Sequence, residues 1–165
     1  MPGYTVEGLP DEITAAARTT MRSPQYGHPA VKEIAAGTGP CRACLEPFIV
    51  GAEERLLFTY RPDGGNGSLG APGPVFIHAR SCTRYHAHRF PPALATLDVI
   101  VEARAAGNRV PFAQRVPGTD VDALIEQLFE DDDVDYINVR HGEAGCHIVR
   151  IDRAEVDARV AMAAL

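Results

Sequence analysis

The stretch VDYINVRHGEAGCHIVRID, residues 134–152, contains the clearest hairpin in the chain. Two runs rich in β-branched and aromatic residues, 134–140 and 146–152, flank the short polar segment HGEAG, as in two antiparallel strands joined by a turn. A second pair of runs, 97–105 and 109–116, flanks Gly107-Asn108, and both residues of that pair tolerate the positive φ of a tight turn. Two hairpins predict a mostly antiparallel sheet.

Apolar periodicity predicts a helix that follows the 97–116 pair in sequence and packs one apolar stripe on the sheet. It begins after Thr119, a residue suited to an N-cap, with Asp122 three positions later. Its apolar stripe has helical spacing and consists of Val121, Leu124, Ile125, Leu128 and Phe129. Further elements are predicted as a short helix over 11–22 and strands over 30–36, 54–60 and 74–79.

These elements predict an α+β fold, because strands follow one another in hairpins with few helices between them. We expect residues 1–165 to form a single domain, a mostly antiparallel sheet with a few packed helices. Its core would span about 30–153. An N-terminal helical segment and a C-terminal tail, 154–165, would be peripheral, and the Gly/Pro-rich segment 61–74 would be a long loop.

Composition and charge narrow the classes of function. The chain is 45% apolar and 23% charged, as in ordinary globular proteins. A net charge of −6 argues against general binding to nucleic acid or to anionic membranes. Neither a basic and apolar leader nor a run of about 20 apolar residues is seen, so a cytoplasmic location and no membrane attachment are expected.

The cysteine pattern predicts a metal site. Cys41 and Cys44 form a C-x2-C pair directly after Gly-Pro, and His78 and Cys82 form an H-x3-C pair at the end of a predicted strand. Three thiolates and one imidazole are a normal tetrahedral set for structural zinc. His86 is a reserve ligand, because it would pair with Cys82 at i, i+4 if residues 81–88 were helical.

Two other interpretations of the cysteines stay open. They can be small buried hydrophobic residues, or a redox pair, although Pro47 would end any helix after the C-x2-C pair, unlike in thioredoxin-type motifs. Cys146 is interpreted as a structural, packed thiol without a cationic partner. Its neighbour His147 is expected on the opposite face of the strand, so the two would form no nucleophile–base pair.

Three segments, GPCRACLEPFIVGAEERLLFTYRP, GPVFIHARSC and YINVRHGEAGCHIVRIDRA, resemble a known family over most of residues 30–153. It is the bacterial family catalogued as domain of unknown function 1203. The shared features are a Cys-Arg knuckle, a Gly-Pro-x-Phe-x-His segment and a terminal hairpin with Gly-Cys. The resemblance implies a small cytoplasmic bacterial domain and no particular activity.

Three functions from different classes are compatible with the sequence. The first is a zinc-stabilised module that binds another protein. The second is a module that binds a small anionic ligand through the terminal hairpin; its candidate residues are Tyr136, Asn138, Arg140, Arg150 and Arg153, with His141 and His147 nearby. The third is a metal-dependent enzyme with His86 or His88 near a metal-bound water, which three cysteine ligands disfavour.

Overall fold

The computed structural model describes residues 3–62 and 72–154, which form two antiparallel sheets and two α-helices. The larger sheet has six strands in the order β5 (His86–Ala87), β1 (Tyr4–Glu7), β9 (His147–Arg153), β8 (Val134–His141), β6 (Asp98–Ala105) and β7 (Arg109–Pro117). The smaller sheet has the order β2 (Val31–Ile34), β3 (Glu54–Tyr60) and β4 (Gly73–His78). The predicted α+β class is confirmed.

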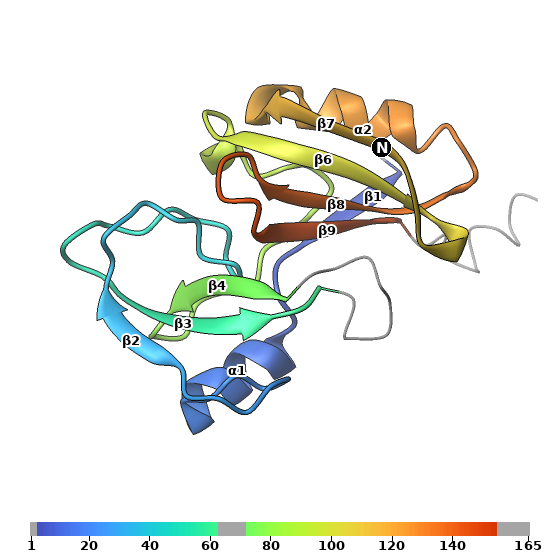
Figure 1. Cartoon of the computed structure of the whole chain (residues 1–165). Helices are drawn as coiled ribbons and strands as arrows, with labels where there is room; N and C mark the ends of the chain where they lie inside the picture. The colour runs from blue at the N-terminus through green and yellow to red at the C-terminus, as the bar shows by residue number, and fades with distance from the viewer. Residues whose placement is uncertain (1–2, 63–71, 155–165) are drawn as a thin grey trace, which may run out of the picture.

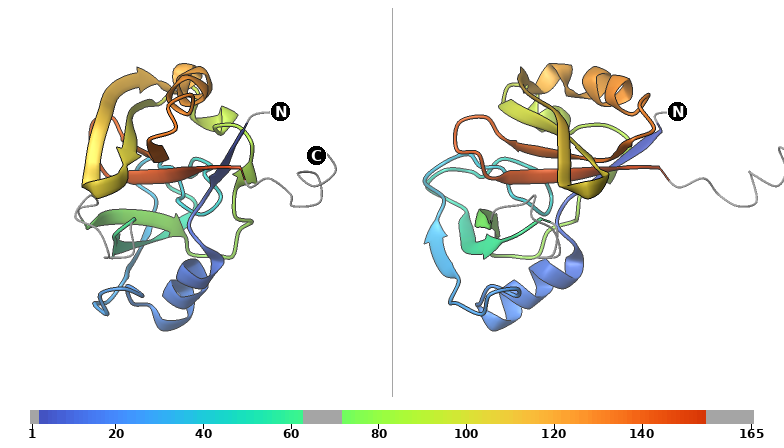
Figure 2. Two further views of the ribbon diagram at one scale, coloured as in Figure 1. Left: turned by 90° about the vertical axis from the view of Figure 1, so that its right-hand side faces the viewer. Right: turned by 45° about the vertical axis from the view of Figure 1, so that its right-hand side comes forward.

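The helices lie on the outer sides of the two sheets (Figure 1). Helix α2 (Val121–Leu128) covers the larger sheet, and helix α1 (Asp11–Thr20) lies beside the smaller one. Short 3₁₀ turns occupy Pro92–Leu94, Ala106–Asn108 and Gly118–Asp120. Figure 2 shows the same arrangement from two further sides, with the smaller sheet facing the surface of the larger sheet opposite α2.

Both predicted hairpins are present. Strand β6 pairs with β7, and β8 pairs with β9, and β6 also pairs with β8, so the two hairpins join into one sheet. The register places Glu102, Asn138 and Arg150 in one row across β6, β8 and β9. Because paired residues project from the same face, this row forms part of a polar face.

The two faces of the larger sheet differ in chemistry because side chains alternate along each strand. Val99, Val101 and Ala103 of β6 are buried in a core shared with α2. The intervening Glu102 and Arg104 are also buried, at 6% and 5% exposure. They lie on the face turned to the smaller sheet, where they line the space between the two sheets together with Tyr60 and Pro74.

A second core lies beneath the smaller sheet and α1. It contains Leu9, Ala17, Ala35, Ala43, Phe48, Leu56, Phe58, Tyr60, Val75 and Ile77, together with the buried thiol of Cys41. The C-x2-C segment is therefore built into a hydrophobic core rather than attached to the surface. That burial restricts how far its cysteines can move.

Several details differ from the sequence-based predictions. Strand β1 was not predicted, yet it lies between β5 and β9 and buries Tyr4 and Val6, so the N-terminal segment is part of a core. Thr119 does not cap α2: it lies in the turn Gly118–Asp120, and its hydroxyl contacts the Asp120 carboxylate at 3.4 Å.

Residues 81–85 are not helical, and His86 begins β5. The predictions for the middle of the 61–74 loop and for the C-terminal tail fall largely on 63–71 and 155–165, which lie outside the described residues. Of the helices that the structure describes, none has the length and apolar character needed to span a membrane.

Candidate metal centre

The C-x2-C segment forms a tight turn that turns both thiols to the same side. The amide of Leu45 donates to the carbonyl of Cys41 at 2.8 Å, and the amide of Cys41 donates to the carbonyl of Glu46 at 3.0 Å. Leu45 takes a left-handed conformation with φ of 59°, which is unusual for a non-glycine residue. Its fully buried side chain helps to hold that conformation in place.

Strand β4 brings the second pair of side chains to this turn. The amide of Arg42 donates to the carbonyl of Phe76 at 2.9 Å, which attaches the turn to β4. His78 is the last residue of β4, and its backbone amide donates to the Sγ of Cys41 at 3.3 Å. Cys82 follows four residues later in the loop that leaves the strand.

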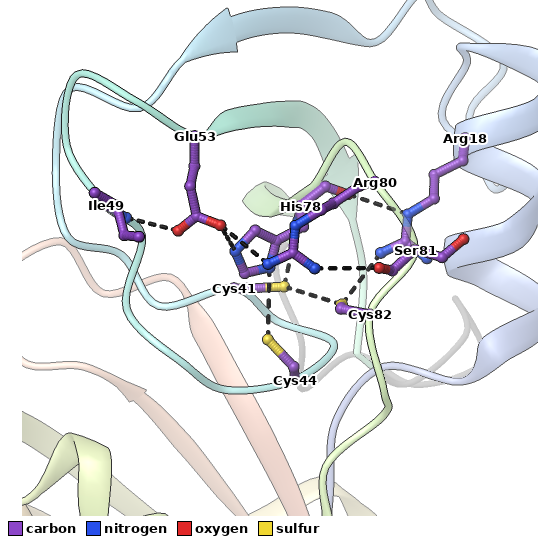
Figure 3. Close-up of polar contacts among 9 residues, drawn as sticks. All are labelled: Arg18, Cys41, Cys44, Ile49, Glu53, His78, Arg80, Ser81 and Cys82. Atoms are coloured by element: carbon purple, nitrogen blue, oxygen red, sulfur yellow. Dashed lines mark hydrogen bonds and ion pairs between the residues drawn. The ribbon is translucent and has the colours of Figure 1, made fainter.

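The four predicted donor groups are close enough to share one ion (Figure 3). The Sγ atoms of Cys41 and Cys82 are 3.9 Å apart, and the Sγ of Cys44 is 3.5 Å from the Nδ1 of His78. One donor atom from each of the four residues lies within 4.8 Å of the others. A tetrahedron with zinc–sulfur bonds of about 2.3 Å has sulfur–sulfur edges of about 3.8 Å. The arrangement is compatible with a metal site.

A carboxylate orients the histidine from behind. The Nε2 of His78 lies 2.9 Å from Oε2 of Glu53, so the carboxylate occupies one ring nitrogen and Nδ1 is the nitrogen that faces the thiols. The amide of Ile49 donates to the other oxygen of Glu53 at 2.7 Å, and Arg80 lies 3.1 Å from Oε2. The Ile49 amide, then His78 and Arg80, lower the pKa of Glu53.

A cation lies on the other side of the group. Arg18 of α1 donates to the Sγ of Cys82 at 3.3 Å and to the carbonyl of His78 at 3.0 Å. Hydrogen bonds from Cys41 and Cys44, with His78 and Arg18, lower the pKa of Cys82. The thiol of Cys44 has the opposite shift, because its hydrogen bonds to Cys41 and Cys82 raise its pKa. Of these two thiols, Cys82 is therefore the one that loses its proton more readily.

Burial and chemistry indicate what the group can do. Cys41 is fully buried, His78 is 2% exposed, and Cys44 and Cys82 are partly exposed. The ring of Phe48 covers His78 at 4.7 Å between ring centres. All four cysteines of the chain are free thiols. Four protein donors complete a tetrahedral set, which is typical of structural rather than catalytic zinc sites.

The reserve ligand His86 is not part of this group. Its Nδ1 lies 3.5 Å from a carboxylate oxygen of Glu7, its neighbour on β1, and His88 contacts the carbonyl of Tyr4 at 2.9 Å. Both histidines belong to the edge of the larger sheet, so the prediction of a helical Cys82/His86 pair was wrong. The proposal of an enzyme that uses either histidine near the metal loses its geometric basis.

The sequence model of a family described as Protein of unknown function (DUF1203) matches residues 38–153. The chain belongs to this family. No curated protein and no solved structure matches the chain. The DUF1203 match includes the four metal-donor candidates, the smaller sheet from β3 onward and both hairpins of the larger sheet. It confirms the resemblance seen in the sequence and assigns no activity.

The terminal hairpin of this DUF1203 protein, formed by β8 and β9, does not bring the predicted anion-binding residues together in one site. The guanidinium of Arg150 lies 3.9 Å from the ring centre of Tyr136 and binds Asp152 at 2.9 Å. Arg153 projects from the other face, where it donates to the carbonyls of Phe129, Asp131 and Val134. Arg153 therefore does not lie with Arg150 and Tyr136, because an odd number of positions along a strand reverses the face.

The remaining two residues of that set, Asn138 and Arg140, lie in a different polar group. Arg140 and Arg104 both contact the carboxylate of Glu102, with Arg104 at 2.6 Å. Asn138 accepts a hydrogen bond from His147 at 2.8 Å. Sequence reasoning missed Glu102 and Arg104, although two charges alternating with apolar residues inside a strand were a signal that could have found them.

Cys146 also has different surroundings from those predicted. Arg42, within the C-x2-C segment, donates to the Sγ of Cys146 at 3.1 Å, so the thiol does have a cationic partner. A register shift at Val139/Arg140 pairs Arg140 with His147. Cys146 precedes β9, and Cys146 and His147 both line the same cavity. Because Cys146 lies outside β9, the alternation of faces along that strand does not decide how the two side chains lie relative to each other.

Proposed function

We propose that this DUF1203 protein is a zinc-stabilised module for binding another protein, with one structural zinc ion held by Cys41, Cys44, His78 and Cys82. One observation carries the metal assignment. Four donor atoms from the C-x2-C turn, the end of β4 and the loop that follows it lie within 4.8 Å of one another, and the carboxylate of Glu53 contacts the histidine. An inert core of thiols would need neither the histidine among the sulfurs nor the carboxylate behind it.

The choice of zinc follows from the donor chemistry. Thiolate and imidazole donors suit zinc, whereas calcium and magnesium prefer oxygen. Thiols must lose their protons to bind zinc, and the Arg18 guanidinium next to Cys82 compensates part of the resulting negative charge. Iron could also use such donors, and metal analysis separates these ions.

A structural role is supported by what the four residues connect. They join the turn after Pro40, the end of β4 and the loop that leads to β5, and Arg18 adds helix α1. Structural zinc contributes on the order of 10 kcal/mol to folding in small domains. Zinc bound here would therefore hold the smaller sheet and α1 together.

Metal analysis of the protein purified without added metal or chelator tests the assignment. We expect about one equivalent of zinc, and we expect Cys41→Ser and Cys82→Ser to lose it. Cys146→Ser is the matched control, since this cysteine is outside the group and should leave the zinc in place. Zinc below about a tenth of an equivalent, with stability indifferent to a strong chelator, would favour buried inert thiols instead.

The protein-binding role is supported by exposed apolar side chains next to the proposed zinc site. Ile34, Ile49 and Val50 are 51%, 64% and 51% exposed. Backbone hydrogen bonds between Ala35 and the 51–53 segment bring them to one end of the smaller sheet. Among the strands that the structure describes, β2 is at the edge of its sheet, where an extended segment of a partner could pair with its outer backbone groups.

A photo-crosslinking residue placed at Val50 tests this surface, with Val110 of β7 as a control of similar exposure, 42%. We expect one discrete protein adduct from position 50 and none from position 110. Ile34→Glu should remove the adduct while leaving the zinc content unchanged. Equal adduct patterns from both positions would remove this surface from the proposal.

A further inference from the structure

A cavity of about 370 Å³ lies between the two sheets, away from the cysteine–histidine group. Its walls include Tyr60 and Pro74 from the smaller sheet and residues of β6, β8 and β9 from the larger sheet. This volume is near the lower end of the about 300–1,000 Å³ that small-molecule sites occupy. The cavity is therefore large enough for a small organic molecule.

The larger sheet lines this cavity with buried polar groups. Glu102, Asn138 and His147 are 6%, 4% and 9% exposed, and Arg140 reaches the cavity from the same face. Burying such groups costs free energy unless hydrogen bonds or charges compensate it. A fold that needed only a packed interface between its sheets would use apolar residues here.

Two of these buried groups have unused hydrogen-bonding capacity. The Nδ1 of His147 and the Oδ1 of Asn138 are paired with each other at 2.8 Å. Burial, together with Arg42 and Arg150, lowers the pKa of His147 to about 3, so its ring is neutral. Within the described part of the chain, neither Nδ2 of Asn138 nor Nε2 of His147 has a hydrogen-bond partner.

Positive charge is concentrated around the cavity although the whole chain carries −6. Glu102 is the one carboxylate among the described lining residues, and it contacts two guanidinium groups. A third guanidinium, that of Arg42, is 2% exposed and donates to Cys146 from behind the cavity wall. The other acceptors of Arg42 are the neutral carbonyls of Pro40 and His147.

We propose that this cavity binds a small organic carboxylate, with Arg140 and the amide of Asn138 as its donors and the thiol of Cys146 beside it. Arginine binds carboxylates through its planar fork. The Nη1 of Arg140 donates to the carbonyl of Gly145 at 3.1 Å, and its Nε contacts Glu102. Its side chain is 33% exposed, so its remaining N–H groups can reach a ligand. The proposal does not depend on the zinc assignment.

The thiol allows a test with two small alkylating reagents that differ in one group. Iodoacetate carries a carboxylate, whereas iodoacetamide is neutral and of similar size. In both reactions the Cys146 thiolate displaces iodide and forms a carbon–sulfur bond, so the thiolate fraction cancels in the ratio of the two rates. Peptide mapping by mass spectrometry separates Cys146 from the other three cysteines.

We expect the iodoacetate/iodoacetamide rate ratio at Cys146 to exceed that of a free cysteine peptide by about tenfold or more, as charge-assisted hydrogen bonds permit. Arg140→Gln should return the ratio to the peptide value. Arg150→Gln is the matched control, because it removes the same charge from the same hairpin but does not line this cavity. A wild-type ratio equal to that of the peptide overturns the proposal.

An equilibrium measurement covers the case in which Cys146 is labelled by neither reagent, and Arg140→Met, which keeps the length of the side chain but removes its charge, replaces Arg140→Gln if the latter fails to fold. Malonate at constant ionic strength should raise the melting temperature of the wild type and of Arg150→Gln, and should not raise that of the Arg140 variant. The same measurement with phosphate in place of malonate shows whether the site prefers a carboxylate to another anion. Equal shifts in all three proteins, or a shift with phosphate alone, overturn the carboxylate assignment.

Discussion

The guanidinium of Arg42 donates a hydrogen bond to the carbonyl oxygen of His147 over 2.6 Å, which joins the cysteine turn of the smaller sheet to the first residue of β9. The same side chain donates to the carbonyl of Pro40 at 2.5 Å and to the Sγ of Cys146 at 3.1 Å. Burial lowers the pKa of Arg42, and contact with Cys146 opposes that shift. Arg42 thus links the proposed zinc site to the wall of the cavity.

Arg42→Lys should destabilise the protein, because an ammonium on a flexible stem cannot reproduce three hydrogen bonds from one planar fork. Each buried carbonyl left without a donor costs about 1–3 kcal/mol, so we expect a loss of about 2–4 kcal/mol in the free energy of unfolding. Chemical denaturation measures it. Arg109→Lys, at an exposed position, should change stability little, and equal stability of the two variants would contradict the role of Arg42.

Glu53→Ala should weaken zinc binding without removing a ligand. The lost contact is the one that orients His78 at 2.9 Å, and loss of such partners lowers metal affinity about 10–100-fold. Competition with a chromophoric chelator measures the change. The control is Glu54→Ala, the adjacent residue, whose half-exposed carboxylate pairs with Lys32. Indistinguishable affinities for the two variants would show that the Glu53 contact does not act on the metal.

Gly8→Ala should displace the cysteine turn, because a Cβ at this position would lie 1.9 Å from the carbonyl oxygen of Ala43. Ala43 lies between Cys41 and Cys44, so the backbone of the cysteine turn must move. We expect the free energy of unfolding to fall by about 1–3 kcal/mol. Gly73→Ala is the control, since a Cβ there meets nothing within 4 Å. Thermal unfolding and zinc content of both variants check the prediction, which fails if Gly8→Ala matches the control.

Local pattern was enough to predict the hairpins and the cysteine group. Alternation and turn residues define β6–β7 and β8–β9, since strand period and turn chemistry depend on neighbouring residues. The spacing of Cys41, Cys44, His78 and Cys82 was sufficient for the same reason: two short pairs each need only a local bend. Strand β1 was missed because it has only four residues, and an alternation of buried and partly exposed side chains over four positions is too short to predict a strand.

The contacts that connect distant segments could not be predicted. Arg42 reaches His147 and Cys146 across 105 and 104 positions, and nothing in its neighbourhood indicates that it is buried. A charged residue beside a cysteine is usually solvent-exposed. The helical Cys82/His86 pair failed because His86 pairs with β1, so that tertiary strand pairing overrode the local i, i+4 pattern.

The protein should become less stable as the pH is lowered, because of His147. Its ring is buried between the sheets, and burial lowers its pKa to about 3. In the unfolded chain the same ring has a pKa of about 6.5. The unfolded state therefore binds a proton more readily, so the contribution of His147 to stability is complete above about pH 6.5 and is lost as the pH falls toward 3. Its loss should be about 1.4 kcal/mol for each pH unit in that interval.

Denaturant unfolding at pH 7.5 and pH 5.0 measures this contribution. Wild type should lose about 2 kcal/mol more between these pH values than His147→Gln, which keeps a donor for Asn138 but does not titrate. Acid also weakens zinc binding, and because that effect is common to both proteins, the difference between them isolates His147. If the two proteins lose the same free energy, the ring is already protonated or well solvated in the folded state, and its neutral pairing with Asn138 is wrong.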